Sequence, residues 1–178
     1  GTARIAAKSV IPAIKAVKHN SVAAVASRDL TRGAEFVREN EIPKAYGTYE
    51  ELLRDENIQA VYIPLPNSEH SRWAVRAMEA GKHVLVEKPF ALNADEAQLM
   101  VSTALEKSVV LMEAFMYRYH ARLGQILELV RKGALGKLRF IQSSMSFPLT
   151  NPDDIRLNAN LGGGALYDLG CYCVDLQR

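Results

Sequence analysis

The amino-acid sequence predicts an α/β protein built on a doubly wound parallel sheet, with helices on both faces of that sheet. As far as residue 112, short apolar runs alternate with helical stretches. These runs are apolar at consecutive positions, which is typical of strands buried on both faces. Several helical stretches also carry their own start or stop signals.

The first part of this pattern begins with a helix. After Gly1, apolar residues recur at helical spacing, at Ile5, Val10, Ile11, Ile14 and Val17. The elements expected next are a valine- and alanine-rich strand at residues 21–26, a helix at Leu30–Glu39, a short strand at Lys44–Tyr46 and a helix that runs through Leu53. Thr48 and Glu51 form a capping box at the start of that last helix.

The second part repeats the same units. Its expected elements are strand Ala60–Ile63, helix 69–80, strand His83–Val86, a helix through Glu106 and strand 109–112. Gly81 stops the first of these helices, and Asn93 with Glu96 caps the second. Because a glycine-rich phosphate turn is normally preceded by a strand, we also expect a strand before Gly1.

The composition changes near residues 115–120, which predicts a boundary between residues 1–116 and residues 117–178. In the second unit we expect a helix at 125–132, a glycine turn and an alternating strand at 138–145. Residues 147–164 are rich in Pro, Asn, Asp and Gly, as in loops that cover a site. The second unit is therefore predicted to be the start of an α+β substrate domain.

Charge and composition point to a small-molecule partner. The 22 basic and 20 acidic side chains are interspersed and give a net charge of +2, so neither nucleic acid nor membrane is an expected partner. No apolar run of about 18 residues is present, and a cytoplasmic protein is expected. Cys171 and Cys173 are interpreted as packing residues, because no further Cys or His stands at metal-ligand spacing. We expect no metal.

The segment Gly1-Thr2-Ala3-Arg4-Ile5-Ala6 has the spacing of a dinucleotide fingerprint, with alanine at the second and third small positions. The amides at such a helix start can receive a pyrophosphate, although a plain helix start is the alternative. About 20 residues later, Ser27 and Arg28 follow a strand. In NAD-binding proteins a carboxylate at this position would bind the free 2′-hydroxyl of the ribose. Serine and arginine suit a 2′-phosphate, which favours NADP over NAD. Asp29 is expected to cap the next helix.

Two further turns follow strands at the edge where ligands bind in such sheets. Pro64-Leu65-Pro66-Asn67 is a rigid turn, and Asn67 either binds the cofactor ribose or caps the next helix. His70 is a cofactor-site candidate whose alternative is capping or packing. Glu87-Lys88-Pro89 places a lysine where the nicotinamide should lie, and its alternative is a solvent-facing lysine paired with Glu87.

Near the end of the chain, Gly162-Gly163-Gly164 precedes a helical segment that carries Asp168 and Tyr172. Since these two residues are four positions apart, they share one helix face. The alternative is an ordinary flexible turn followed by a surface helix.

Together these motifs resemble the Gfo/Idh/MocA family, named after glucose-fructose oxidoreductase, inositol dehydrogenase and a rhizopine catabolism protein. The resemblance covers nearly the whole chain. It implies that Lys88 lies at the nicotinamide and the substrate hydroxyl and that Asp168 contacts substrate. Many members carry His at this position, whereas this sequence carries Tyr172. The glucose-fructose oxidoreductase and dimeric dihydrodiol dehydrogenase branches carry Tyr there as well. We expect Tyr172 to be the acid/base, with a pKa lowered by Lys88.

The resemblance also implies an oxidoreductase that transfers hydride between NADP(H) and a CH-OH group of a sugar, polyol or dihydrodiol. A homo-oligomer is expected for a full-length protein. A non-catalytic dinucleotide sensor of the same fold is the alternative. The expected cofactor-binding residues are Gly1, Thr2, Ala3, Arg4, Ile5, Ser27, Arg28, Leu65, Pro66, Asn67, His70, Glu87, Lys88 and Arg118. For Arg118 a salt bridge between the two units is an equal alternative.

Overall fold

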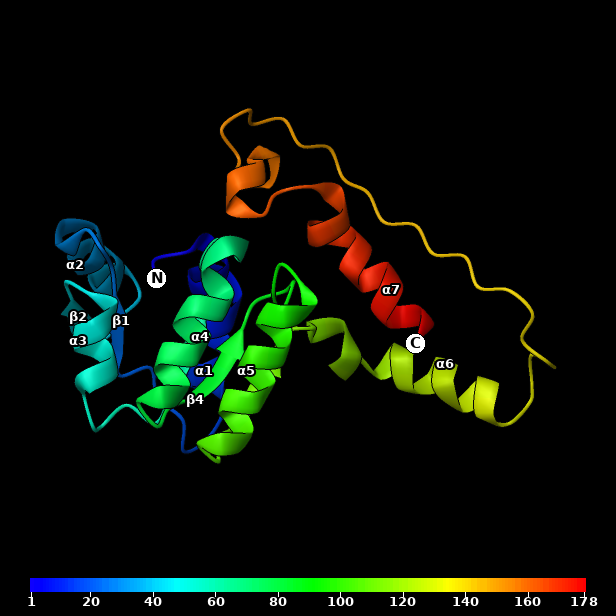
Figure 1. Cartoon of the computed structure of the whole chain (residues 1–178), viewed down its shortest axis with the longest axis horizontal. Helices are drawn as coiled ribbons and strands as arrows, with labels where there is room; N and C mark the ends of the chain where they lie inside the picture. Colours follow the sequence, from blue (N-terminus) through cyan, green and yellow to red (C-terminus); the bar gives the residue numbers. More distant parts are fainter.

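A computed structural model describes residues 1–178 (Figure 1). The α-helices are α1 (Ile11–Ala16), α2 (Leu30–Glu39), α3 (Tyr49–Arg54), α4 (His70–Glu79), α5 (Ala94–Glu106), α6 (Ala121–Arg131) and α7 (Cys171–Gln177). The strands are β1 (Ala24–Ala26), β2 (Lys44–Tyr46), β3 (Ala60–Ile63), β4 (His83–Val86) and β5 (Leu111–Glu113). Two π-helical turns, Ala6–Val10 and Leu166–Gly170, lead into α1 and α7. Short 3-10 turns lie at Asn67–Glu69, Met116–Tyr119, Ile155–Leu157 and Ala159–Leu161. None of the helices is long and apolar enough to cross a membrane.

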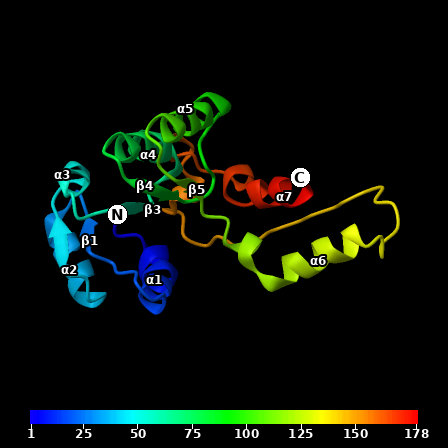
Figure 2. The same cartoon turned by 90° about the horizontal axis from the view of Figure 1, so that it is seen from below.

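The parallel strands β3, β4 and β5 form the centre of the first unit. Helices α4 and α5 lie together on one side of these strands, and α1 lies on the other (Figure 2). The largest buried cluster fills the space between the strands and α4–α5, with Met78, Val86 and Met100 fully buried. The predicted α/β alternation is therefore confirmed.

The strands do not form the single sheet that we expected. β1 pairs only with β2, also in parallel, and no backbone hydrogen bonds join this pair to β3. A mainly apolar cavity of about 470 Å³ lies between β1 and β3, with part of its lining from α1. β1 and β3 each keep one edge without a strand partner.

Helix starts follow the capping signals. Thr48 accepts a hydrogen bond from the amide of Glu51 at 3.1 Å, and Asn93 accepts one from Glu96 at 2.9 Å. In both cases the glutamate side chain reaches back, to the amide of Gly47 and of Leu92 respectively. Gly81 ends α4 with φ of 73°.

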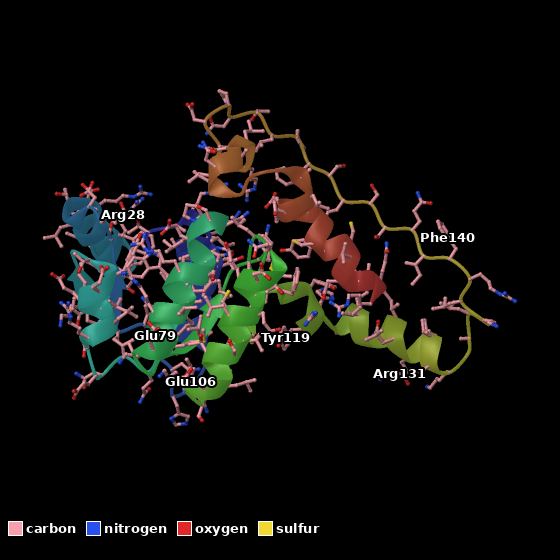
Figure 3. All side chains as sticks on the ribbon, in the orientation of Figure 1. Arg28, Glu79, Glu106, Tyr119, Arg131 and Phe140 are labelled. Atoms are coloured by element: carbon pink, nitrogen blue, oxygen red, sulfur yellow. The ribbon has the colours of Figure 1, made fainter.

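The secondary structure of the second unit differs from the prediction more than that of the first unit does. α6 starts four residues before the predicted 125, because the His120 ring accepts a hydrogen bond from the Arg122 amide at 3.1 Å. The predicted strand at 138–145 is wrong: this segment is extended but pairs with nothing, and a strand needs a neighbour for its amides. Phe140 on this segment is 80% exposed and points away from the helices (Figure 3). The chain then returns to the first unit above α4 and ends in α7 (Figure 1).

Candidate active site

The turns after β3 and β4 lie side by side at the carboxyl edge of the sheet, as their parallel register requires. Gly1 lies against the first of these turns, where a Cβ on Gly1 would come within 2.9 Å of Leu65 Cδ2. The start of the fingerprint helix therefore faces the Pro64-Leu65-Pro66 turn. Arg4 and Ile5 begin that helix with exposed side chains.

Lys88 points inward from the second turn toward the second unit. Its Nζ donates to Asp168 Oδ1 at 2.6 Å and to the Asp168 carbonyl at 2.8 Å. The two side chains are only 15% and 13% exposed. This geometry excludes the solvent-facing alternative for Lys88 and joins two residues 80 positions apart.

Tyr172 lies beside this ion pair. Lys88 Nζ is 5.3 Å from the centroid of the Tyr172 ring, which is within cation–π range. The rings of Phe115 and Tyr117 lie 5.1 and 5.7 Å from the Tyr172 ring and form an apolar wall. The structure thus brings Lys88, Asp168 and Tyr172 to one place, as the sequence predicted.

The predicted effect of Lys88 on Tyr172 is wrong. Burial, with the negative charges of Glu87 and Asp168 among the further causes, raises the pKa of Tyr172 to about 12. The phenol loses hydration beside Phe115, and the ammonium faces the ring while its charge is shared with Asp168. Tyr172 is therefore protonated at neutral pH.

Glu87 is held by a residue that sequence reasoning missed. The Tyr62 hydroxyl on β3 donates to Glu87 Oε1 at 2.5 Å. Burial, followed by this contact, raises the pKa of Tyr62 and keeps its hydroxyl a donor. Tyr62 lies inside an apolar strand whose residues are all expected to pack in the core. No local sequence pattern therefore predicts that Tyr62 contacts Glu87.

His70 lies between the turn after β3 and the turn after β4 and contacts both. It is fully buried, with Nδ1 2.8 Å from the Pro89 carbonyl and Nε2 2.9 Å from the Leu65 carbonyl. Burial is the main cause that lowers the pKa of His70. These contacts fit the packing alternative, and the cofactor contact expected of His70 remains a prediction.

Asn67 does not cap the next helix, and its binding of the cofactor ribose remains a prediction. Its Nδ2 donates to the Gly162 carbonyl at 2.7 Å, so it ties the first turn to the glycine-rich segment. Nearby, the Tyr167 hydroxyl donates to the Leu92 carbonyl at 2.7 Å. These bonds bring the second unit down onto the edge of the sheet.

A second hollow opens beside the fingerprint. It is lined by Thr2, Ser27, Arg28, Asp29, Arg32 and Tyr49. Ser27 is buried, while Arg28 projects from the outer end of this region (Figure 3). Asp29 caps α2 as expected, with its Oδ1 accepting from the Arg32 amide at 3.1 Å. Arg32, which sequence reasoning missed, also lines the hollow and lies four positions after Arg28.

Arg118 forms a salt bridge with α7 and not with the turns after β3 and β4. Its guanidinium pairs with both oxygens of Asp175 on α7, and the Tyr117 hydroxyl donates to the same carboxylate. With the boundary after residue 116, this salt bridge lies within the second unit, so it is not the bridge between the two units that the sequence left as an alternative. The cofactor role of Arg118 remains a prediction.

Comparisons with known proteins show which family the chain resembles. The family model described as "Oxidoreductase family, NAD-binding Rossmann fold" matches residues 1–115, and the GFO/IDH/MocA C-terminal domain model matches residues 124–178. D-xylose 1-dehydrogenase (NADP(+)) 2 from Haloferax volcanii is 46% identical over 179 residues, which cover 100% of this chain and 54% of that protein.

Two other relatives match nearly the whole chain at a similar level of identity. Trans-1,2-dihydrobenzene-1,2-diol dehydrogenase from Xenopus tropicalis is 36% identical over 96% of this chain and 50% of its own length. The crystal structure of a 3-ketoreductase from Actinomadura kijaniata with NADP and TDP-benzene superposes with a TM-score of 0.91 at 37% identity, over 97% of this chain and 53% of that one. The chain thus spans about half the length of the relatives it matches. With both models matched and the Lys88, Asp168 and Tyr172 constellation assembled, the chain belongs to the Gfo/Idh/MocA oxidoreductase family.

Proposed function

We propose that this protein is an NADP-dependent oxidoreductase that interconverts a CH-OH group and a carbonyl on a sugar, polyol or dihydrodiol. The observation that carries the proposal is the meeting of the Lys88 ammonium, the Asp168 carboxylate and the Tyr172 phenol at the sheet edge. The names of the relatives, which include a xylose dehydrogenase and a dihydrodiol dehydrogenase, support the substrate class.

The residues present fit NADP. The buried Ser27 hydroxyl and the guanidinium groups of Arg28 and Arg32 supply hydrogen-bond donors and positive charge for a 2′-phosphate, and Asp29 is engaged as a cap. The helix start at Gly1–Ile5 would receive the pyrophosphate, with Leu65 and Pro66 beside it. When bound, NADP supplies the hydride acceptor at its nicotinamide ring, and NADPH supplies the donor.

The protein's own groups handle the proton. In the oxidising direction Tyr172 accepts the proton of the substrate hydroxyl, and in the reducing direction the Tyr172 phenol donates it to the forming alkoxide. Lys88 donates a hydrogen bond to that oxygen and stabilises its negative charge. Asp168 orients Lys88 and the substrate. Phe115 and Tyr117 exclude water from one side of the phenol.

The test is an activity panel on the intact protein that contains this chain. D-xylose, D-glucose and a trans-dihydrodiol are offered with NADP or NAD, and turnover is followed at the nicotinamide absorbance. We expect turnover of at least one substrate, with NADP preferred. Tyr172→Phe should lower kcat by about 100- to 10,000-fold while NADPH binding by fluorescence titration stays within about twofold.

Tyr119→Phe is the matched control, because Tyr119 is 74% exposed and lies away from the turns that hold Lys88 (Figure 3). It should leave kcat unchanged. Tight NADPH binding with no turnover of any substrate would favour the sensor alternative instead. Full activity in Tyr172→Phe would refute the acid/base assignment.

A further inference from the structure

Asp168 is held from two sides, and only one side belongs to the motifs found in the sequence. Its Oδ1 accepts from Lys88 at 2.6 Å, whereas its Oδ2 accepts from Arg156 Nε at 2.9 Å. Arg156 lies on the turn Ile155–Leu157, inside the loop that precedes the glycine-rich segment. Both oxygens of the carboxylate are therefore engaged by cations from different parts of the chain.

Arg156 is itself fixed in place, unlike a typical surface arginine. Its guanidinium also lies 3.3 Å from both oxygens of Asp154, and its amide donates to Asp154 Oδ1 at 2.9 Å. The guanidinium lies 5.8 Å from the centroid of the Phe147 ring. A planar guanidinium held on two carboxylates and a ring face has few other orientations available.

The backbone of Arg156 is locked to the glycine-rich segment. Its carbonyl accepts from the Gly164 amide at 2.8 Å, and a Cβ on Gly163 would come within 2.6 Å of that carbonyl oxygen. The side chain and main chain of Arg156 thus connect the loop, the glycine turn and Asp168. Loop position and carboxylate orientation are coupled through one residue.

We propose that Arg156 is a positioning residue that acts through Asp168. It holds the carboxylate in the rotamer that aims the Lys88 ammonium at the substrate oxygen beside Tyr172. This inference rests on the proposed function for its catalytic consequence. Its structural part is that the Lys88–Asp168 contact depends on Arg156. This part can be tested without measuring turnover. Without Arg156, Asp168 Oδ2 loses its partner and the carboxylate gains rotational freedom, so Lys88 loses its fixed direction.

The kinetic test is a double-mutant cycle in the intact protein. Arg156→Ala should lower kcat about 10- to 100-fold, with the NADPH dissociation constant within about twofold of wild type. In an Asp168→Asn background the same substitution should change kcat less than about threefold, because a residue that acts through Asp168 has nothing left to position. Added guanidinium should restore part of the activity of Arg156→Ala, and Arg156→Lys should retain more activity than Arg156→Ala. Arg131→Ala, at an exposed position on α6, is the control and should match wild type.

The structural test is a crystal structure of Arg156→Ala. We expect the Lys88–Asp168 contact to be lost or rotated. An unchanged contact overturns the proposal even if the intact protein turns over no substrate, and so separates this inference from the proposed function. An equal loss of kcat from Arg156→Ala in both backgrounds overturns it as well, since Arg156 would then act independently of Asp168.

Discussion

Tyr172 is surrounded by groups that disfavour its ionised form. Burial against Phe115 is the first cause of its raised pKa, and the charges of Glu87 and Asp168 add to it. The protein therefore carries a phenol that is ready to donate a proton at neutral pH. In the proposed reaction, carbonyl reduction uses this protonated phenol directly, whereas oxidation of the substrate hydroxyl first requires ionisation of the phenol.

We expect the two directions to differ in pH dependence. Tyr172 has a pKa of about 12 and must lose its proton to act as a base. The kcat/KM for oxidation should then rise about tenfold per pH unit near neutrality, because the phenolate fraction rises by that factor. Reduction uses the phenol, whose fraction is nearly constant, so its kcat/KM should stay flat from about pH 6 to about pH 9.

Initial-rate profiles in both directions at saturating NADP or NADPH check this expectation. The residual activity of Tyr172→Phe should show no such oxidation slope. An oxidation profile that is already flat between about pH 6 and about pH 8 would mean that the phenol ionises well below its expected range.

Residues with a local signal could be recognised from the sequence, and residues without one could not. Lys88 follows a wholly apolar strand and Asp168 follows a glycine-rich turn, so each stands out from its neighbours. Arg156 lies in a loop without a recognisable motif, and Tyr62 lies within a strand. Their importance comes from partners 12 and 25 positions away, which no local pattern specifies.

At the scale of single elements, the capped helices of the first unit are the best-determined features. Asn93 and Glu96 hold the start of α5 through two hydrogen bonds, one from the Glu96 amide and one from the Leu92 amide. Caps of this kind satisfy amides that have no partner inside the helix. Since the residues involved are at most four positions apart, the sequence reveals them directly.

Loss of the Asn93 cap should destabilise the protein without changing its site. Asn93→Ala is expected to lower the free energy of unfolding by about 1 kcal/mol, because the Glu96 amide loses its acceptor at 2.9 Å. Urea denaturation followed by circular dichroism measures this change. Asn93→Asp keeps an acceptor oxygen and should stay near wild type, and equal losses in the two variants would exclude capping as the cause.

The segment at 138–145 shows the limit of pattern reasoning at this scale. Its alternating apolar residues fit a strand, yet it lies unpaired, and Phe140 and Met145 are exposed. Alternation describes which side chains share a face, whereas a strand also requires a neighbour with matching hydrogen bonds. The split between β1–β2 and β3–β5 has the same origin, because apolar character does not specify pairing.

At the scale of the whole molecule, the two units meet through a small number of directed contacts. Lys88 binds Asp168, Asn67 donates to the Gly162 carbonyl, and the Tyr167 hydroxyl donates to the Leu92 carbonyl. All three contacts join the first unit to the segment between residues 162 and 175. The candidate active site therefore exists only while these units are held together.

Gly162 is the tightest point of this contact. It has φ of 76°, and a Cβ there would lie 2.5 Å from Leu92 Cδ2 and 2.8 Å from Asn67 Cβ. Gly162→Ala should therefore lower the free energy of unfolding by about 1–3 kcal/mol and reduce kcat more than about tenfold, because the segment must move off the sheet edge. Thermal unfolding and initial rates measure the two effects.

Gly124 provides the control for this substitution. It lies inside α6, where an added Cβ would meet nothing within 4 Å. Gly124→Ala should leave kcat unchanged and stabilise the protein by roughly 0.5–1 kcal/mol, since alanine favours a helix interior. If Gly162→Ala behaved like Gly124→Ala, the close approach of Gly162 to Leu92 would be shown to affect neither stability nor kcat.

The amino-acid sequence was sufficient to predict the α/β alternation, the capped starts of α2, α3 and α5 and the motifs that carry Lys88, Asp168 and Tyr172. These features depend on periodicity and on side chains within a few positions of one another, so they can be read along the chain. The arrangement in space was needed for the split sheet, the unpaired segment at 138–145, the raised pKa of Tyr172 and the contact of Arg156 with Asp168. Each of these depends on burial or on contacts between separate elements, and both arise only once the chain has folded.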